Sequence, residues 1–361
     1  MVSEPGTVEG PRGAKPSEFG EMIDFLNFVF RSNVGRRPSM GGDYPYLYRE
    51  SNAHNLRHIR VNGRIISSVS IYPARVQWGE AILKVGGIGG VATDPNCRKQ
   101  GYAGMVLEDC LRVMESEGYD LSLLWTGIPD YYRRWGWENA GEVWKFFIDR
   151  STITYLPSAP SGEVLTSPTD ARAIDAVQKL HTEARRGVVR DRELTEIMMS
   201  TRTRHKIAVL LVNDNPFAYI IHSFGEQADV KDFGGDPEGV LGLMRIVFGR
   251  EGARAMHILT PAEDAGIAQL LRQRGFQARP ECVGMIALID PLRIVKRYGI
   301  EDLVVAPDSG PGGGWNVTKG SQSVTYSRNE MVKFLFGPER PPGIHHPKLP
   351  LPFYYDWLDH M

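Results

Sequence analysis

The chain has few of the features that mark disulfide-stabilised, zinc-binding or membrane-spanning proteins. Its 361 residues include only three cysteines, Cys97, Cys110 and Cys282, and their wide spacing fits neither a disulfide framework nor a metal motif. No apolar run approaches the ~20 residues that span a bilayer. Residues 1–16 are polar and rich in glycine and proline, without the apolar core of a signal peptide. We therefore expect a disordered lead over 1–16, a cytoplasmic protein and no metal.

Neither sign of charge is in excess. Lysine and arginine number 42 against 43 aspartates and glutamates, a formal net charge of −1. This balance argues against a general nucleic-acid binder, and we expect neither a nucleic acid nor a membrane as partner. The hydrophobic fraction of 42% is ordinary for a globular protein, and the length allows two or three domains.

The most informative segment lies between Val91 and Ala103. A β-rich run over 83–91 ends in a turn at Asp94-Pro95, and an amphipathic helix begins soon after Gly101. Amide groups at a helix start attract anions, and a glycine allows close approach of the backbone. Arg98 and Lys99 add two cationic side chains. The pattern predicts a pyrophosphate site, with an ordinary basic turn as the alternative; neither a Walker loop nor a dinucleotide fingerprint is present.

The segments around this loop predict a mixed α/β domain. A helix with apolar spacing of three and four covers 18–31. Strand-like runs at 56–61 and 65–78 flank Asn62-Gly63, a strong hairpin signal. Further strands are expected at 121–125 and 143–148.

A linker rich in proline, serine and glycine follows at 156–163, and then the pattern restarts as an internal repeat. The repeat lacks the residues that predict an anion site and a tyrosine proton donor in the first half. Its loop at 234–239 carries two carboxylates that would repel a pyrophosphate, and Leu271 stands where the first half has Tyr132. We therefore expect one competent and one structural half.

The last seventy residues form a third region. It has a helix-like run at 292–298, a strand candidate at 317–326, and a capping box in which Ser327 is followed by Glu330. The final stretch is rich in proline and then in aromatic residues.

The strand, basic Gly-x-Ala loop and helix resemble the coenzyme A pyrophosphate loop of the GCN5-related N-acetyltransferase (GNAT) superfamily. Two such units and a cap resemble the enhanced-intracellular-survival family within it. The resemblance implies an α/β (α+β) fold with a catalytic GNAT domain at 17–154, a degenerate GNAT-like domain at 164–290 and a sterol-carrier-like region at 291–361. Seventy residues are short for a complete sterol-carrier-like fold, which disfavours lipid binding.

The resemblance also implies a site for acetyl-coenzyme A, the acyl donor. The backbone of the strand end would bind the pantetheine arm like an added strand and hold the thioester oxygen. The loop would bind the pyrophosphate, and a second wall would follow the next strand. These positions are Val91, Ala92, Thr93, Arg98, Lys99, Gln100, Gly101, Tyr102, Ala103, Gly104, Gly127 and Ile128.

The resemblance assigns the general acid to Tyr132, within Tyr131-Tyr132-Arg-Arg-Trp-Gly-Trp137, although a core tyrosine before a tight turn remains the alternative. The base is harder to place because the strand over 85–91 contains no carboxylate. In the resembled family the carboxylate at the C-terminus of the chain enters the active site. In this chain that carboxylate belongs to Met361. Three other groups on the same tail stay open as bases: Asp356, Asp359 and His360.

The predicted function is the transfer of an acetyl group to a primary amine by direct attack, with a small molecule or a lysine side chain as acceptor. Asp43 with Tyr44, Tyr46 and Tyr48 offers an aromatic pocket for an amine, with surface or core packing as the alternative. Homo-oligomerisation stays open. A module that binds acyl-coenzyme A without catalysis, as a sensor or scaffold, is the competing hypothesis.

Overall fold

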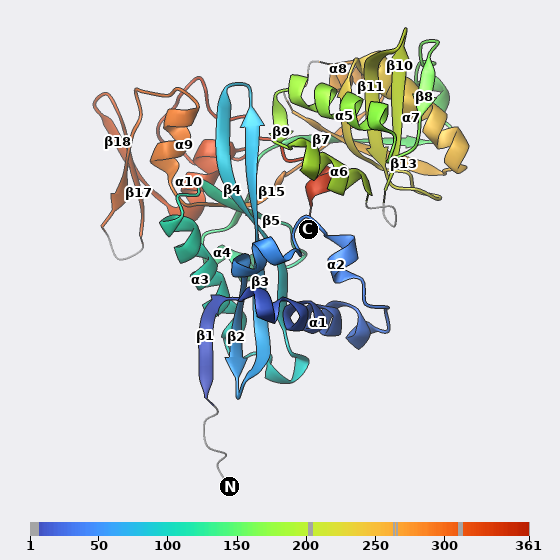
Figure 1. The fold of residues 1–361 in the computed structure, drawn as a ribbon. Helices are drawn as coiled ribbons and strands as arrows, with labels where there is room; N and C mark the ends of the chain where they lie inside the picture. The colour runs from blue at the N-terminus through green and yellow to red at the C-terminus, as the bar shows by residue number, and fades with distance from the viewer. Residues whose placement is uncertain (1–6, 201–204, 263, 265, 310–312, 361) are drawn as a thin grey trace.

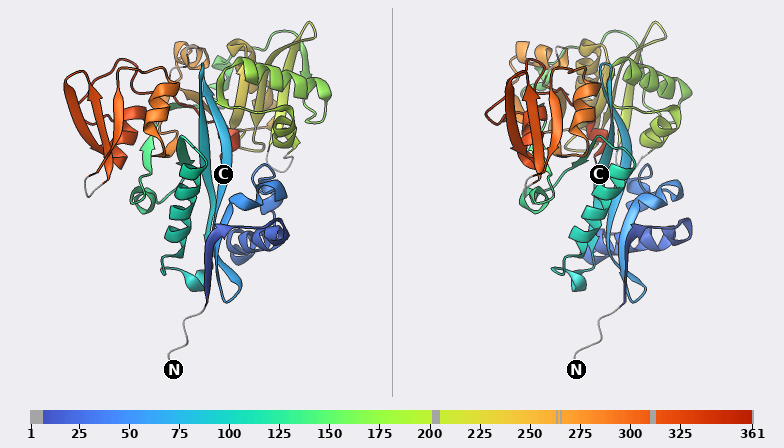
Figure 2. Two further views of the ribbon diagram at one scale, coloured as in Figure 1. Left: turned by 60° about the vertical axis from the view of Figure 1, so that its left-hand side comes forward. Right: turned by 90° about the vertical axis from the view of Figure 1, so that its left-hand side faces the viewer.

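The computed structural model describes residues 7–200, 205–262, 264, 266–309 and 313–360. It contains two α/β units side by side and a C-terminal region that packs against both (Figure 1). The last residues of the chain return to the middle of the molecule, between the two units, as Figure 2 also shows.

The first unit is built on an eight-stranded sheet in the order β1-β2-β3-β4-β5-β15-β6, with β9 paired to β3. Among the described strands of this sheet, β4 and β5 are the one parallel pair. Its strands are β1 (Val8–Gly13), β2 (Leu56–Val61), β3 (Arg64–Trp78), β4 (Ala81–Thr93), β5 (Leu121–Leu124), β6 (Glu138–Ala140), β9 (Arg186–Val188) and β15 (Gly284–Leu288).

The prediction of a disordered lead is wrong for residues 8–13. They form β1, an edge strand antiparallel to β2. An edge strand tolerates proline because one of its sides needs no amide donor, so the composition of this segment did not prevent pairing. Arg12 adds ion pairs to Glu9 and Glu18, at 2.7 and 2.6 Å.

Helices cover both faces of this sheet. They are α1 (Phe19–Phe30), α2 (Met40–Asp43), α3 (Tyr102–Ser116) and α4 (Pro129–Arg133). Helices α1 and α3 lie on opposite sides of the strands (Figures 1 and 2). The expected hairpin is confirmed: Asn62 and Gly63 both have positive φ, at 51° and 75°, as a two-residue hairpin turn requires.

The two units exchange a strand. β15, expected in the second domain, lies between β5 and β6 of the first sheet. Strand β7 (Val143–Asp149), expected in the first domain, pairs with β13 and β14 of the second unit. The predicted boundary at 154 therefore does not separate two independent domains. Alternation of apolar residues predicts that a strand exists, whereas its neighbours are chosen by long-range pairing.

The second unit is built on two sheets, in the orders β12-β11-β10-β8 and β13-β7-β14. Its strands are β8 (Glu163–Leu165), β10 (Lys206–Val212), β11 (Asn215–His222), β12 (Val230–Gly235), β13 (Ala255–Pro261) and β14 (Ala278–Glu281), and its helices are α5 (Ala171–Glu183), α6 (Arg192–Ser200), α7 (Pro237–Glu251) and α8 (Ile267–Gln273). Strand β12 was not predicted, because its sequence is short and half polar.

The C-terminal region holds a small three-stranded sheet and two helices. They are α9 (Pro291–Arg297), β16 (Val304–Asp308), β17 (Gly314–Lys319), β18 (Gln322–Ser327) and α10 (Arg328–Phe336). The predicted capping box is confirmed, with Ser327 and Glu330 bonded reciprocally at the start of α10. Where one strand was expected, a hairpin of β17 and β18 forms.

Within the part of the chain that is described, no helix combines the length and the apolar character needed to cross a bilayer.

Candidate active site

The parallel strands β4 and β5 diverge. They pair only over three residues each, from Val85 to Gly87 and from Leu121 to Leu123, while β4 continues to Thr93. Beyond Gly87, β4 pairs with β3 alone among the described strands. An unpaired strand edge offers amide and carbonyl groups to an extended ligand. Val91, Ala92 and Thr93 lie on this edge.

A bulge distorts β4 where it diverges. The register with β3 shifts between Ser68 and Ser70, which pair with Ala92 and Gly89. Gly90, inside the bulge, has φ +55°, and a Cβ there would lie 2.5 Å from the Tyr48 hydroxyl. Only glycine fits that position without moving its neighbour. Bulges re-aim backbone groups next to active sites, and this one sits beside the predicted thioester position at Val91.

The predicted anion loop joins the end of β4 to the start of α3. Gly101 is the N-cap, with φ +86°, and no described side chain caps the helix. The first helical bond runs from the Met105 amide to the Gly101 carbonyl, so the amides of Tyr102, Ala103 and Gly104 precede it. Three flanking side chains of the loop are exposed to solvent: Arg98, Lys99 and Gln100. The loop thus combines uncapped amides with exposed cations.

The corresponding helix of the second unit is closed to anions. The Asp236 carboxylate caps α7 by accepting a bond from the Gly239 amide at 3.0 Å, and Glu238 in its first turn pairs with Arg274 at 2.7 Å. The fixed negative charge occupies the place where an anion would bind. The predicted loss of chemistry in the second half agrees with this geometry.

Tyr132 lies on α4 and is 7% exposed. It belongs to the same buried cluster as Ile88 of β4 and Val106 of α3, against which Val91 and Tyr102 also pack. Its ring contacts Tyr131 edge-on, at 5.1 Å between centroids. Burial, and to a lesser degree Tyr131, raise the pKa of Tyr132 to about 12, so the hydroxyl stays protonated at neutral pH.

The predicted second wall follows β5. Gly127 has open space where a Cβ would stand, and the Ile128 side chain is 62% exposed. The Ile128 amide donates to Thr126 Oγ1 at 3.1 Å. Both residues therefore lie at the surface between β5 and α4.

The C-terminal tail is buried between the two units. The His360 ring stacks on Trp125, which directly follows β5, with centroids 3.8 Å apart. The Tyr46 hydroxyl donates to the His360 carbonyl at 3.3 Å. The tail thus reaches the open end of β5 and the loop after α2. Met361, whose carboxylate is the predicted base, lies outside the described residues.

A buried charge cluster anchors this tail. Arg190 donates to Asp232 of β12 and to Asp359 of the tail, and Asp356 lies 3.6 Å away. Asp356 also accepts from the Val188 amide at 2.7 Å. The Arg190 side chain is 1% exposed. Three carboxylates therefore share one guanidinium in a water-poor site.

The surplus of negative charge raises the proton affinity of the tail. Burial first, and then the neighbouring carboxylates, raise the pKa of Asp356 to about 7 and that of Asp359 to about 6. Asp232 keeps a lowered pKa because Arg190 and His181 face it. Burial lowers the pKa of His360 to about 3, so it is a very weak base. A pKa near 7 suits a general base, but Asp356 and Asp359 are already bound to Val188 and Arg190, which counts against them as the catalytic base. The low pKa of His360 counts against that residue.

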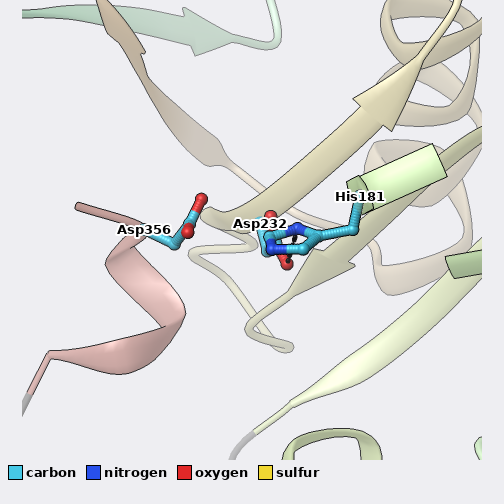
Figure 3. Close-up of side chains that lie close together, drawn as sticks. All are labelled: His181, Asp232 and Asp356. Carbon is cyan, nitrogen blue, oxygen red and sulfur yellow. Dashed lines mark ion pairs between the residues drawn. The ribbon is translucent and has the colours of Figure 1, made fainter. Parts of the chain in front are cut away.

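One side of this cluster has the spacing of a metal site. Ligand atoms of His181, Asp232 and Asp356 lie within 4.8 Å of one another, and Figure 3 shows the three side chains converging. The Arg190 guanidinium, however, already binds the Asp232 carboxylate at 2.5 Å, and His181 is bonded to the Val188 carbonyl at 2.7 Å and the Tyr219 hydroxyl at 3.0 Å. The Arg190 guanidinium therefore supplies the positive charge that a metal ion would bring. Because the donor atoms of Asp232 and His181 are already bound, these residues do not fit a metal ion.

Arg190 and Asp232 were not anticipated from the sequence. Arg190 stands in an ordinary polar segment, and its carboxylate partners are 42 and 169 residues away. No local sequence pattern connects such residues. Their contact could have been inferred only from correlated substitutions at the two positions in homologous sequences.

Comparison with known proteins supports this reading of the fold. Residues 11–140 match the family model described as the acetyltransferase (GNAT) domain. No curated protein matches the sequence. Among solved structures, a probable N-acyltransferase from Enterococcus faecalis is similar with a TM-score of 0.65 and 16% identity, covering 89% of this chain and 84% of that one. A GCN5-related N-acetyltransferase from Anabaena variabilis has a TM-score of 0.64 and 15% identity, covering 89% and 85%.

The family match covers the N-terminal unit, which is therefore similar to the acetyltransferase (GNAT) domain. More particularly, 89% of the chain is similar in fold to 85% of Eis1 from Mycobacterium abscessus, with a TM-score of 0.59 and 13% identity.

Proposed function

We propose that the protein is an N-acetyltransferase that moves an acetyl group from acetyl-coenzyme A to a primary amine by direct attack. The observation that carries this proposal is one juxtaposition: the diverging edge of β4, the uncapped start of α3 and the buried Tyr132 share one cluster. Each part matches one need of the reaction, namely a slot for an extended arm, an anion site and a proton donor.

The donor would be held by backbone more than by side chains. The pyrophosphate would sit on the amides of residues 101–104, with Arg98 and Lys99 outside it. The pantetheine arm would extend along Val91 to Thr93, between β4 and the wall at Gly127 and Ile128. An amide at the bulge would polarise the thioester carbonyl as negative charge develops on its oxygen.

In the reaction the amine nitrogen bonds to the thioester carbon, and the carbon–sulfur bond then breaks. The amine must first be neutral, since an ammonium has no lone pair. A carboxylate accepts the proton that the nitrogen loses, and the departing sulfur receives hydrogen-bond donation or a proton from Tyr132. Solvent restores both groups.

The pKa of Tyr132 shapes its part in this scheme. An ordinary thiol has a pKa of about 8.5, well below the value of about 12 for this phenol. Complete transfer of the proton to the thiolate is therefore uphill. We expect the hydroxyl to act chiefly as a hydrogen-bond donor to the developing charge on sulfur.

The terminal carboxylate of Met361 is the proposed base. The tail before it is fixed by Trp125, Tyr46 and Arg190, and His360 stacks on the residue that directly follows β5. Asp356 and Asp359 are held by Arg190 on the side of the second unit.

Release of free thiol from acetyl-coenzyme A with a panel of primary amines tests the proposal. We expect Tyr132→Phe to lower turnover by about 10²-fold or more and to leave the calorimetric affinity for coenzyme A unchanged. Tyr131→Phe is the matched control and should keep its activity. Coenzyme binding without thiol release in the unmodified protein would instead identify a non-catalytic sensor.

The base is tested without cutting the tail. One glycine added after Met361 moves the carboxylate by about 3.5 Å and retains every described contact of the tail. We expect turnover to fall at least about tenfold with coenzyme affinity intact. Full activity in the extended protein would exclude the terminal carboxylate.

A further inference from the structure

A small cavity lies on the α1 face of the first sheet, next to the bulge of β4. Its volume is about 190 Å³, and it is lined by Phe30, Arg31, Met40, Tyr44, Leu47, Tyr48 and Gly90. Pockets for drug-sized ligands measure about 300–1,000 Å³. This one therefore suits a single ring or a short branched chain.

The walls of the cavity are apolar and aromatic. Met40 and Leu47 are buried, at 5% and 1% exposed. The Tyr44 ring stands edge-on to Tyr46 and Tyr48, with centroids 6.3 and 6.2 Å away. Rings held in this way offer a fixed apolar surface at little entropic cost.

The charges at the cavity neutralise each other. Arg31 donates to the Asp43 carboxylate at 2.7 Å, to Ser39 Oγ at 2.8 Å and to the Phe30 carbonyl at 3.1 Å. Asp43 accepts a further bond from Ser39 Oγ at 2.7 Å. The Asp43 carboxylate is therefore neutralised by Arg31, so its charge does not attract an amine as expected. A polycation would gain little binding free energy from this ion pair.

The cavity adjoins the proposed reaction centre. Gly90 forms one wall, and Val91, the proposed thioester contact, follows it along the strand. One residue step is about 3.8 Å. On the other side, Tyr46 connects the aromatic wall to the tail through its bond with the His360 carbonyl. The cavity thus lies beside the proposed thioester contact and is connected through Tyr46 to the described end of the tail.

We propose that the acceptor is a primary amine carried on one small apolar or aromatic group, which fills this cavity while the nitrogen faces the β4 bulge. This inference rests on the proposed function and narrows its substrate class. It distinguishes such monoamines from polyamines and amino sugars, whose additional polar groups would lose water without gaining partners.

The full chain with acetyl-coenzyme A provides the test, with phenethylamine and isopentylamine compared with spermidine and glucosamine. We expect kcat/KM to be at least about tenfold higher for the two apolar monoamines, as burial of one small apolar group allows. A preference for spermidine or glucosamine would overturn this inference and leave the acetyltransferase proposal intact. Thiol release with none of the amines would overturn both.

A variant localises the effect. Tyr44 is half-buried in a loop, so Tyr44→Ala should fold, and circular dichroism checks this. We expect it to raise the KM for phenethylamine about tenfold, a larger change than for spermidine, with coenzyme affinity retained. Tyr155→Ala, at a tyrosine 59% exposed and remote from the cavity, is the control. An equal effect of Tyr44→Ala on all amines would contradict the assignment of this cavity.

Discussion

Asp356 connects the tail to the rest of the molecule through a hydrogen bond with the Val188 amide and an ion pair with Arg190. Its Oδ2 accepts a hydrogen bond from the Val188 amide and lies beside the Arg190 guanidinium. Asp232 and Asp359 form ion pairs with the same guanidinium. One cation cannot neutralise three buried carboxylates, so the site gains by holding a proton. The tail is therefore docked most firmly when that proton is present.

We expect this docking to weaken as the pH rises. An unfolded aspartate has a pKa of about 3.9, and the folded value for Asp356 is about 7, so the folded state binds a proton that the unfolded state has lost. Stability thus falls with rising pH up to about 7. Asp359, with a pKa of about 6, acts in the same direction. His360 has the opposite effect below about pH 6.5 and none above it.

The measurement is thermal unfolding from pH 5 to 8. Asp356→Asn should lose part of the decline in unfolding temperature that the unmodified protein shows, because asparagine stays neutral throughout. Lysine and histidine groups elsewhere contribute equally to both proteins and cancel in the difference. Asp214→Asn, in the exposed turn between β10 and β11, is the control and should keep the original profile.

At the scale of elements, helices α3 and α7 occupy similar places in their units but differ at the N-terminus. The first amides of α3 are uncapped, whereas a carboxylate caps those of α7. Both follow the last strand of a hairpin-rich half, and both begin near a glycine-rich turn. Helix α3 begins with an uncapped glycine, whereas α7 begins with Asp236, whose carboxylate already occupies the amides. Competence for an anion thus depends on one capping position.

Installing the α7 arrangement in α3 tests this. Gly101→Asp places a carboxylate where the pyrophosphate would bind, and we expect the affinity for coenzyme A to fall about 10- to 100-fold. Each lost or reversed helix-end interaction contributes about 1 kcal/mol, and a direct charge conflict adds to it. Calorimetric titration gives the value.

Gly101→Asn separates charge from backbone strain. Asparagine has the same shape and adopts positive φ as aspartate does, but it carries no charge. We expect it to weaken coenzyme binding much less. Equal losses in the two variants would assign the effect to the strained backbone and contradict the electrostatic account.

At the scale of the whole molecule, the exchanged strands make the two units interdependent. β15 fills an interior place in the first sheet, and β7 lies between β13 and β14 in the second. Without its partner unit, each sheet would expose unpaired backbone and apolar side chains along an interior edge. The tail adds to this linkage, with bonds to Leu335, Leu259 and Val188 from three parts of the chain.

We therefore expect a fragment ending at residue 154 to be insoluble or unfolded alone, because it lacks β15 and leaves β7 without partners. Co-production with residues 155–361 should restore a soluble complex that elutes as one species. The full chain should unfold in one transition by calorimetry. A folded 1–154 fragment with native-like circular dichroism would contradict this interdependence.

The local features of the site were predictable because their signals are short-range. The hairpin at Asn62-Gly63, the helix beginning after Gly101 and the capping box at Ser327 each depend on neighbours within a few residues. The roles of Tyr132 and Met361 in the reaction stay predictions. The edge strand at 8–13 was missed because composition alone does not show that β2 has a free side to pair with.

The sequence by itself determined many of the longer strands and helices and the helix start without a capping carboxylate, since backbone propensity, periodicity and capping act locally. Only the tertiary structure decided that β7 and β15 change places, that Arg190 gathers three distant aspartates, and that His360 stacks on Trp125 after β5. Strand pairing, buried charge and side-chain packing depend on residues far apart in the chain, and their free energies exist only once the fold has brought those residues together.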